Sequence, residues 1–398
     1  MFHRLALRAS QTHTVGILVI VTALFFHAVT GGHMLVASNL QNIVTANAHI
    51  VVLTIGMVLV VTINQLDVSV GSVAAFASMS AAVAIASWGV PWWGGMILGL
   101  CVGAGVGAIQ GLFVSRLRIP ALIVTIVGML VLRGAVQWAS QSLSLPVPRE
   151  FTVLGAGYLP DWGRVVGVDA ATLVFGAVVA AVVVAWRLVS HARRSRRLGI
   201  EAGARGVRIE CAAVVVAAGV LVWLFGTGRE GTSFPVPGVV IVVLVLVYEV
   251  VSKRTAFGRH VRAVGGNLRA AELSGVDVTR VQMLVMVNMG ALAALAGLMF
   301  AGRSTAAGPQ DGMGWELDAI VAVFIGGAAI SGGRGSIMGA VMGAALMGVL
   351  VNGLLLVGVG SDRAQVVKGL VLLVAVTLDA VRRRGAEDEP RTRPLLTT

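Results

Sequence analysis

Residues 43–63 read IVTANAHIVVLTIGMVLVVTI, and residues 70–88 read VGSVAAFASMSAAVAIASW. An apolar α-helix needs about 20 residues to cross the roughly 30 Å hydrocarbon layer of a membrane, and both runs have that length. Similar runs follow along the chain, which predicts an all-α bundle of transmembrane helices. We expect ten to twelve spans, at 15–30, 43–63, 70–88, 94–114, 121–138, 170–190, 210–226, 237–252, 282–301, 317–331, 336–358 and 363–381.

Two of these runs, 237–252 and 317–331, are short for a full span. We expect such runs to be tilted, discontinuous or re-entrant. Glycine recurs every fourth residue in two others, at Gly99, Gly103, Gly107 and Gly111 and again at Gly335, Gly339 and Gly343. Each row lies on one helix face, where it permits close packing either inside one subunit or between two subunits.

The composition excludes a water-soluble protein. Of the 398 residues, 57% are hydrophobic and 12% are charged, and the mean hydropathy is +0.91. Soluble domains carry about 25% charged residues, so this chain has too few to cover a surface that faces water. The 51 glycines agree with this interpretation, because small residues allow transmembrane helices to pack closely.

The net charge of +12 follows the positive-inside pattern rather than indicating a nucleic-acid partner. An excess of arginine and lysine marks cytoplasmic loops. If the N-terminus is cytoplasmic, the basic residues concentrate on that side, and we expect both termini there. The basic inner segments are then 1–14, 115–120, 191–209, 253–281, 332–335 and the C-terminal tail.

The opposite side is rich in acidic residues. We consider two interpretations, which are docking of a partner by complementary charge and ordinary solvated loops. The eight outer carboxylates in this topology are Glu150, Asp161, Asp169, Glu230, Asp311, Glu316, Asp318 and Asp362.

The inner segment 253–281 carries a pattern typical of a short helix beneath the membrane. Asn267 is a good N-cap, Leu268–Leu273 forms about two turns, and Ser274-Gly275 ends them. We expect Gly265-Gly266 to form a sharp turn with positive φ before this helix. A short helix tied at both ends can transmit movement from another protein, and the alternative is a purely structural loop.

The same segment resembles the inner loop of ATP-binding cassette (ABC) monosaccharide permeases, and three more motifs occur in the family's order. They are DVSVGS at 67–72, IPALIVT with GML at 119–130, and SGGRGS followed by paired Gly-Ala at 331–344. The resemblance covers residues 40–381. It is greatest to the D-xylose type, because ribose-type members lack a counterpart of the basic loop 191–208 and the apolar run after it. In place of the family's G-G-T-S-L, however, residues 326–330 read GGAAI, which leaves the sugar open.

This resemblance implies a permease of the bacterial inner membrane, with residues 1–384 as one transmembrane domain and 385–398 as a flexible cytoplasmic tail. The implied partners are ATP-binding cassette subunits, a periplasmic or lipid-anchored sugar-binding protein, and a second permease copy. The segment 253–281 would couple the permease to its ATPase. The residues implied in coupling are Gly258, Arg259, Gly265, Gly266, Asn267, Ala270, Ala271, Glu272, Ser274 and Gly275.

The residues give no sign of an enzyme, a cofactor site or a metal site. A phosphate-binding loop needs Gly-Lys-Ser/Thr, and neither Lys253 nor Lys368 follows a glycine. We therefore expect a separate subunit to hydrolyse ATP. The alternatives are an ABC permease for another small solute, such as ribose, another sugar, a branched-chain amino acid or a furanone signal, and a secondary transporter.

Asp67 stands between two apolar runs, and we consider two roles for it. It either caps a tight inner turn, or it belongs to a helix break whose polar groups, Asn64, Asp67 and Ser69, face the transport pathway or its gate. The remaining charges within spans lie near span ends, where side chains can extend to the interface. A pathway nearly free of charge suits a neutral, hydroxyl-rich solute. The residues near span ends are Arg133, Arg187, Glu249, Lys368 and Asp379.

Overall fold

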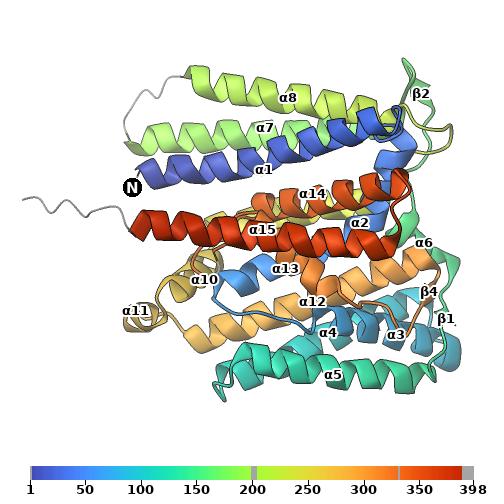
Figure 1. Cartoon of the computed structure of the whole chain (residues 1–398), viewed down its shortest axis with the longest axis vertical. Coiled ribbons are helices and arrows are strands. Elements are labelled where there is room, and N and C mark those ends of the chain that lie inside the picture. Colours follow the sequence, from blue (N-terminus) through green and yellow to red (C-terminus); the bar gives the residue numbers. More distant parts are fainter. Residues whose placement is uncertain (1, 199–203, 330–331, 388–398) are drawn as a thin grey trace, which may run out of the picture.

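The computed structural model describes residues 2–198, 204–329 and 332–387, and it confirms the all-α bundle (Figure 1). In this part of the chain, nine helices are long and apolar enough to cross a membrane. These nine are α2 (Ala37–Thr62), α3 (Val70–Trp88), α4 (Trp92–Ser115), α5 (Ala121–Ser140), α7 (Ala170–Leu198), α8 (Ala204–Gly226), α9 (Val236–Arg254), α12 (Val278–Ser304) and α14 (Ile337–Leu356). Two further long helices are α1 (Phe2–Val29) and α15 (Ser361–Glu387).

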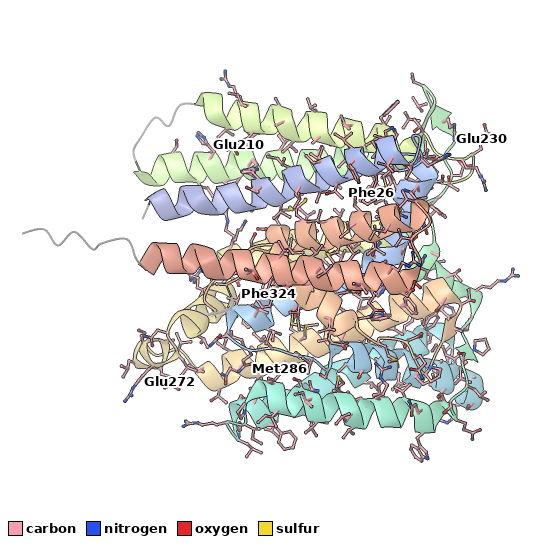
Figure 2. The ribbon with its side chains drawn as sticks, viewed as in Figure 1. Phe26, Glu210, Glu230, Glu272, Met286 and Phe324 are labelled. Atoms are coloured by element: carbon pink, nitrogen blue, oxygen red, sulfur yellow. The ribbon has the colours of Figure 1, made fainter. Side chains whose placement is uncertain are left out.

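The shorter elements gather at the two ends of the bundle. They are α6 (Arg149–Ala156), α10 (Ala256–Gly266), α11 (Leu268–Leu273), α13 (Trp315–Ile325), β1 (Leu145–Pro146), β2 (Arg164–Val165), β3 (Val168–Asp169) and β4 (Ala306–Ala307). Helices α10 and α11 mark one end, and α6 and the strands mark the other (Figure 1). We call these the inner and outer ends, following the predicted charge orientation. Glu272 lies at the inner end and Glu230 at the outer end (Figure 2).

Helix α2 lies at the centre of the bundle because it is apolar on all sides, as expected of a fully buried helix. It packs against α9, α12, α13 and α14, and Leu53, Ile55 and Met57 are completely buried. Both glycine rows pack inside the subunit. A Cβ at Gly103 would lie 2.5 Å from the carbonyl oxygen of Gly290 in α12, and one at Gly343 would lie 2.1 Å from that of Ala322 in α13.

Helices α7 and α8 form a hairpin at the edge of the bundle (Figure 1). Only 11% and 6% of their apolar windows are buried, so the residues that resemble the extra length of xylose-type permeases lie at the periphery. The predicted tail 385–398 begins inside α15, which continues to Glu387, and 388–398 lies outside the described residues.

The run predicted at 317–331 is a discontinuous span. Helix α13 has 11 residues, enough for about 16 Å. It starts halfway through the bundle, because the ring centroid of Trp315 lies 4.3 Å from that of His49, near the midpoint of α2. The preceding loop 308–314 therefore descends from the outer end. At its tip the backbones of Gly312 and Gly71 touch, since a Cβ at Gly71 would lie 2.0 Å from the carbonyl oxygen of Gly312.

Candidate transport pathway and coupling elements

The short inner helix is where the sequence predicts it. Asn267 caps α11 by accepting a hydrogen bond from the amide of Ala270 at 2.9 Å. Ser274 ends the helix, and Gly275 follows with a φ of 80°. The predicted capping and termination of α11 are confirmed.

Most of the predicted coupling residues are accessible at this end. Leu273 is 86% exposed and Leu268 is 44% exposed, and our sequence interpretation did not single out either residue. Their exposure at the end of the bundle becomes evident only in the structure. The predicted residues divide into the exposed Arg259, Gly266, Asn267, Ala270, Glu272, Ser274 and Gly275 and the buried Gly258, Gly265 and Ala271.

The expected positive φ at Gly265-Gly266 is wrong. Both glycines belong to the last turn of α10, and neither is among the described residues with positive φ. Gly265 instead allows close backbone contact. A Cβ there would lie 1.6 Å from the carbonyl oxygen of Thr62, whereas one at Gly266 would meet nothing within 4 Å.

Three segments meet at Gly265. The amide of Gly333 donates a 2.8 Å hydrogen bond to the carbonyl oxygen of Thr62, and a Cβ at Gly332 would lie 2.7 Å from the Cβ of Asn64. We call this contact of Thr62, Asn64, Gly265, Gly332 and Gly333 the inner junction. It joins α10 to the end of α2 and to the connection between α13 and α14.

The segment 63–69 is a genuine helix break, and Asp67 shapes it. One carboxylate oxygen, Oδ1, accepts hydrogen bonds from the Ser69 amide at 2.8 Å and from the Ser69 hydroxyl at 2.7 Å. The Gln110 side-chain amide donates to the same hydroxyl at 2.9 Å. An aspartate bonded to the backbone two residues ahead is a common turn motif.

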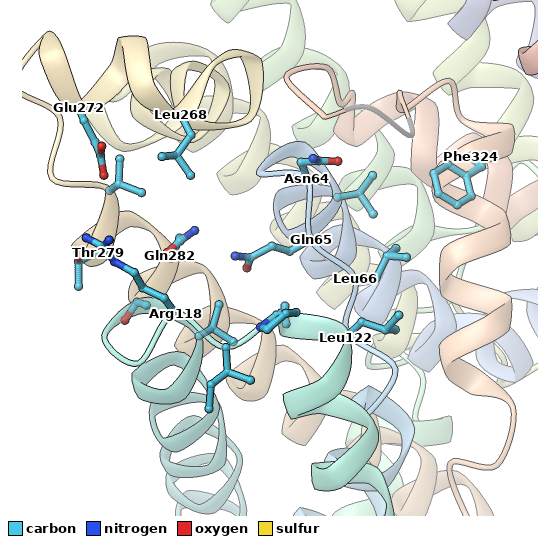
Figure 3. Close-up of a pocket in the computed structure, with 17 residues that line it drawn as sticks. Asn64, Gln65, Leu66, Arg118, Leu122, Leu268, Glu272, Thr279, Gln282 and Phe324 are labelled. Atoms are coloured by element: carbon cyan, nitrogen blue, oxygen red, sulfur yellow. The ribbon is translucent and has the colours of Figure 1, made fainter.

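A cavity of about 710 Å³ lies beside this break at the inner end (Figure 3). Gln65 and Gln282 point toward one another across it. The other labelled lining residues come from the break, α4–α5, α11, α12 and α13, and are Asn64, Leu66, Arg118, Leu122, Leu268, Glu272, Thr279 and Phe324. The structure places Asn64 in this wall. Asp67 and Ser69 do not line the cavity, and they are 2% and 0% exposed.

Several charges predicted to extend to the interface have partners inside the chain instead. Lys368 donates to both carboxylate oxygens of Asp318 at 3.0 and 2.9 Å. Arg133 donates to the carbonyl oxygen of Asp311 at 2.6 Å, and Arg187 pairs with Glu210 at 2.8 Å. Glu249 accepts from the amide of Met338 at 3.3 Å. The side chain of Asp379 lies outside the described residues.

Three features described above are typical of a transport protein. They are the bundle of membrane helices, the discontinuous span, and the cavity beside a capped inner helix. A family model described as "Branched-chain amino acid transport system / permease component" matches residues 39–376. The chain belongs to this permease family. No solved structure matches the chain.

Relatives of this permease match over most of its length. It is 33% identical to the xylose transport system permease protein of Haemophilus influenzae, over 94% of this chain and 97% of that protein. It is 34% identical to the xylose transport system permease protein of Escherichia coli, over 92% of this chain and 91% of that protein. It is 31% identical to the ribose import permease protein of Escherichia coli, over 86% of this chain and 85% of that protein. The permease is therefore a multi-pass protein of the bacterial inner membrane.

The geometry at Asp67 predicts different outcomes for two substitutions in the permease. Asp67→Asn is expected to retain uptake, because the amide oxygen can accept both Ser69 hydrogen bonds. Asp67→Ala removes both bonds and leaves the buried Ser69 amide unpaired, at a cost on the order of 1 kcal/mol or more in folding free energy. Folded protein in the membrane and solute uptake are measured together. Normal insertion with complete loss of uptake by Asp67→Asn would contradict the turn role and support a charge-dependent gate.

Proposed function

We propose that this permease is the membrane subunit of an ABC importer for a monosaccharide, with a D-xylose-like pentose favoured. The proposal rests first on the xylose permeases, which are similar over more than 90% of the chain. The inner cavity supports it as well, because its facing Gln65 and Gln282 amides suit a neutral, hydroxyl-rich solute. Ribose is the second candidate, since the ribose import permease matches over 86% of the chain.

The coupling role of α10 and α11 is part of the proposal. Helix α11 exposes Leu273 for contact with an ATPase subunit, and its residues Leu268 and Glu272 also line the cavity. Helix α10 touches the end of α2 at Gly265. A push on α10–α11 would thus be transmitted to the break 63–69 and to the connection after α13, which would reshape the cavity.

The proposed partners are ATP-binding cassette subunits at the inner end, a periplasmic or lipid-anchored sugar-binding protein at the outer end, and a second permease copy. Half-buried charges on α5, α13 and α15 support the second copy. In an isolated subunit Arg133, Glu316 and Asp318 would border hydrocarbon, where charged groups are costly.

We expect the purified permease alone to have no ATPase activity. Vesicles that contain the permease, its ATPase subunits and the loaded binding protein should take up D-xylose only when ATP is present. The same vesicles without the ATPase are the control. Uptake driven by a proton gradient in the absence of ATP would contradict the ABC assignment and favour a secondary transporter.

A further inference from the structure

Charged side chains gather where α13 begins, halfway through the bundle. Arg133 of α5 donates to the carbonyl oxygens of Asp311 at 2.6 Å and Pro309 at 3.4 Å, so it holds the descending loop. The carboxylate of Glu316 lies at the first turn of α3, because a Cβ at Gly71 would be 2.7 Å from its Oε2 atom. Arg133 is also within electrostatic reach of Glu316.

None of these charges is sealed inside the protein. Arg133, Asp311 and Glu316 are all partly exposed in the subunit, and Leu317 on the same turn is 57% exposed. An ionised group in hydrocarbon costs several kcal/mol and normally faces a polar cavity or a partner. This face of α13 therefore borders a polar space rather than lipid tails, and the proposed second copy would enclose that space.

Two helices connect this cluster to the inner cavity. Helix α5 carries Leu122 in the cavity wall and Arg133 in the cluster, about 16 Å apart along the helix. Helix α13 carries Phe324 in the cavity wall and Glu316 in the cluster, about 12 Å apart. Each helix thus has one residue at the inner cavity and one at mid-depth.

Unused hydrogen-bonding groups occur at both positions. The Ser72 hydroxyl is buried in the first turn of α3, beside Gly71, and has no hydrogen-bond partner among the described residues. Ser72 is 1% exposed. At the inner cavity, the Oε1 atom of Gln65 is likewise buried without a partner in the described structure. Buried polar groups are normally paired, so each of these two positions holds a hydrogen-bonding group that the described structure leaves unused.

We infer that Glu316 and Arg133, beside the buried Ser72 hydroxyl, form a binding position for the neutral sugar at mid-depth, before it reaches the inner cavity. The Glu316 carboxylate accepts hydrogen bonds from sugar hydroxyls, and the Arg133 guanidinium donates to sugar oxygens. Bonds to charged groups are the stronger ones, so Glu316 and Arg133 provide most of the affinity. This inference rests on the proposed sugar import.

The first test uses Glu316→Gln in vesicles with the ATPase subunits, the binding protein and D-xylose. The matched control is Glu150→Gln, which changes an exposed carboxylate of α6 at the outer end. We expect Glu316→Gln to lower uptake about tenfold or more, while ATP hydrolysis stimulated by the loaded binding protein stays within about twofold of the parent. Unchanged uptake, or a parallel loss of hydrolysis and folded protein, would overturn the inference.

The second test asks whether the position is open to water. Cys101 and Cys211 are replaced by serine, and Glu316→Cys is treated with a charged, membrane-impermeant thiol reagent. We expect the reagent to modify the new cysteine, and we expect turnover with D-xylose to slow this modification. Val216→Cys on α8, 66% exposed on the proposed lipid-facing hairpin, is the unmodified control. Absence of modification at Glu316→Cys, or a rate that D-xylose does not change, would overturn the inference. Failure of the parent chain to import D-xylose would instead count against the proposed function.

Discussion

Replacement of Gly265 by leucine is expected to abolish sugar uptake. Even a Cβ at this position would lie 1.6 Å from the carbonyl oxygen of Thr62 and 2.7 Å from the amide nitrogen of Gly333. Both atoms belong to backbone, so neither can rotate away. The inner junction would have to separate, at a cost above about 3 kcal/mol, the upper range for overpacking in a core. Uptake, ATP hydrolysis and folded protein are measured in the same vesicles.

The neighbouring glycine provides the matched control. Gly266→Leu places the same side chain one residue later, where a Cβ meets nothing within 4 Å, and it should retain most uptake. If Gly265→Leu inserts and still hydrolyses ATP without uptake, the junction transmits movement. If it fails to insert, the junction is needed for folding. Normal transport by Gly265→Leu would show that α10 does not contact α2 as described.

Gly71→Val is expected to have an effect of similar size at mid-depth. Its Cβ would lie 2.0 Å from the carbonyl oxygen of Gly312 and 2.7 Å from the Glu316 carboxylate. The descending loop 308–314 would be displaced and the start of α13 would move with it. We expect less folded protein and at least a tenfold loss of uptake, on the order of 1.4 kcal/mol or more.

The control for this substitution is Gly134→Val in α5, where a Cβ would meet nothing within 4 Å. Both substitutions add the same β-branched side chain to a helix, so the intrinsic helix penalty is shared. The difference between them reports the Gly71–Gly312 contact. Equal uptake by the two variants would mean that the loop does not depend on that contact.

Much of the fold could be predicted from the sequence because apolar run length determines a transmembrane helix. The cap at Asn267 and the end of α11 at Ser274 could be predicted for a local reason, since they depend on side chains within three residues. For the short run 317–331, the sequence alone did not distinguish a tilted, a discontinuous and a re-entrant segment. The depth at which α13 begins is determined by the packing of Trp315 against His49, which is a contact between distant segments.

The candidate site was less predictable, because a sequence does not show which backbones touch. Gly265 suggested a turn, whereas its role is contact with Thr62. Lys368 suggested an interfacial side chain, whereas it pairs with Asp318, 50 residues away along the chain. Glu316 suggested an outer loop, whereas the loop before α13 carries it to mid-depth. Each of these errors concerns a long-range contact that local pattern cannot encode.

The α7–α8 hairpin has an evolutionary consequence. Its contacts with the rest of the chain include Phe234 against Phe175 and Phe225, and Arg254 of α9 against Trp186. The chain leaves and re-enters the bundle on the same side of the membrane, so an ancestor could gain or lose the pair without inverting any later helix. The residues lining the inner cavity come from other helices. Lineages that differ in this hairpin can therefore diverge in size while they inherit the same route for the solute.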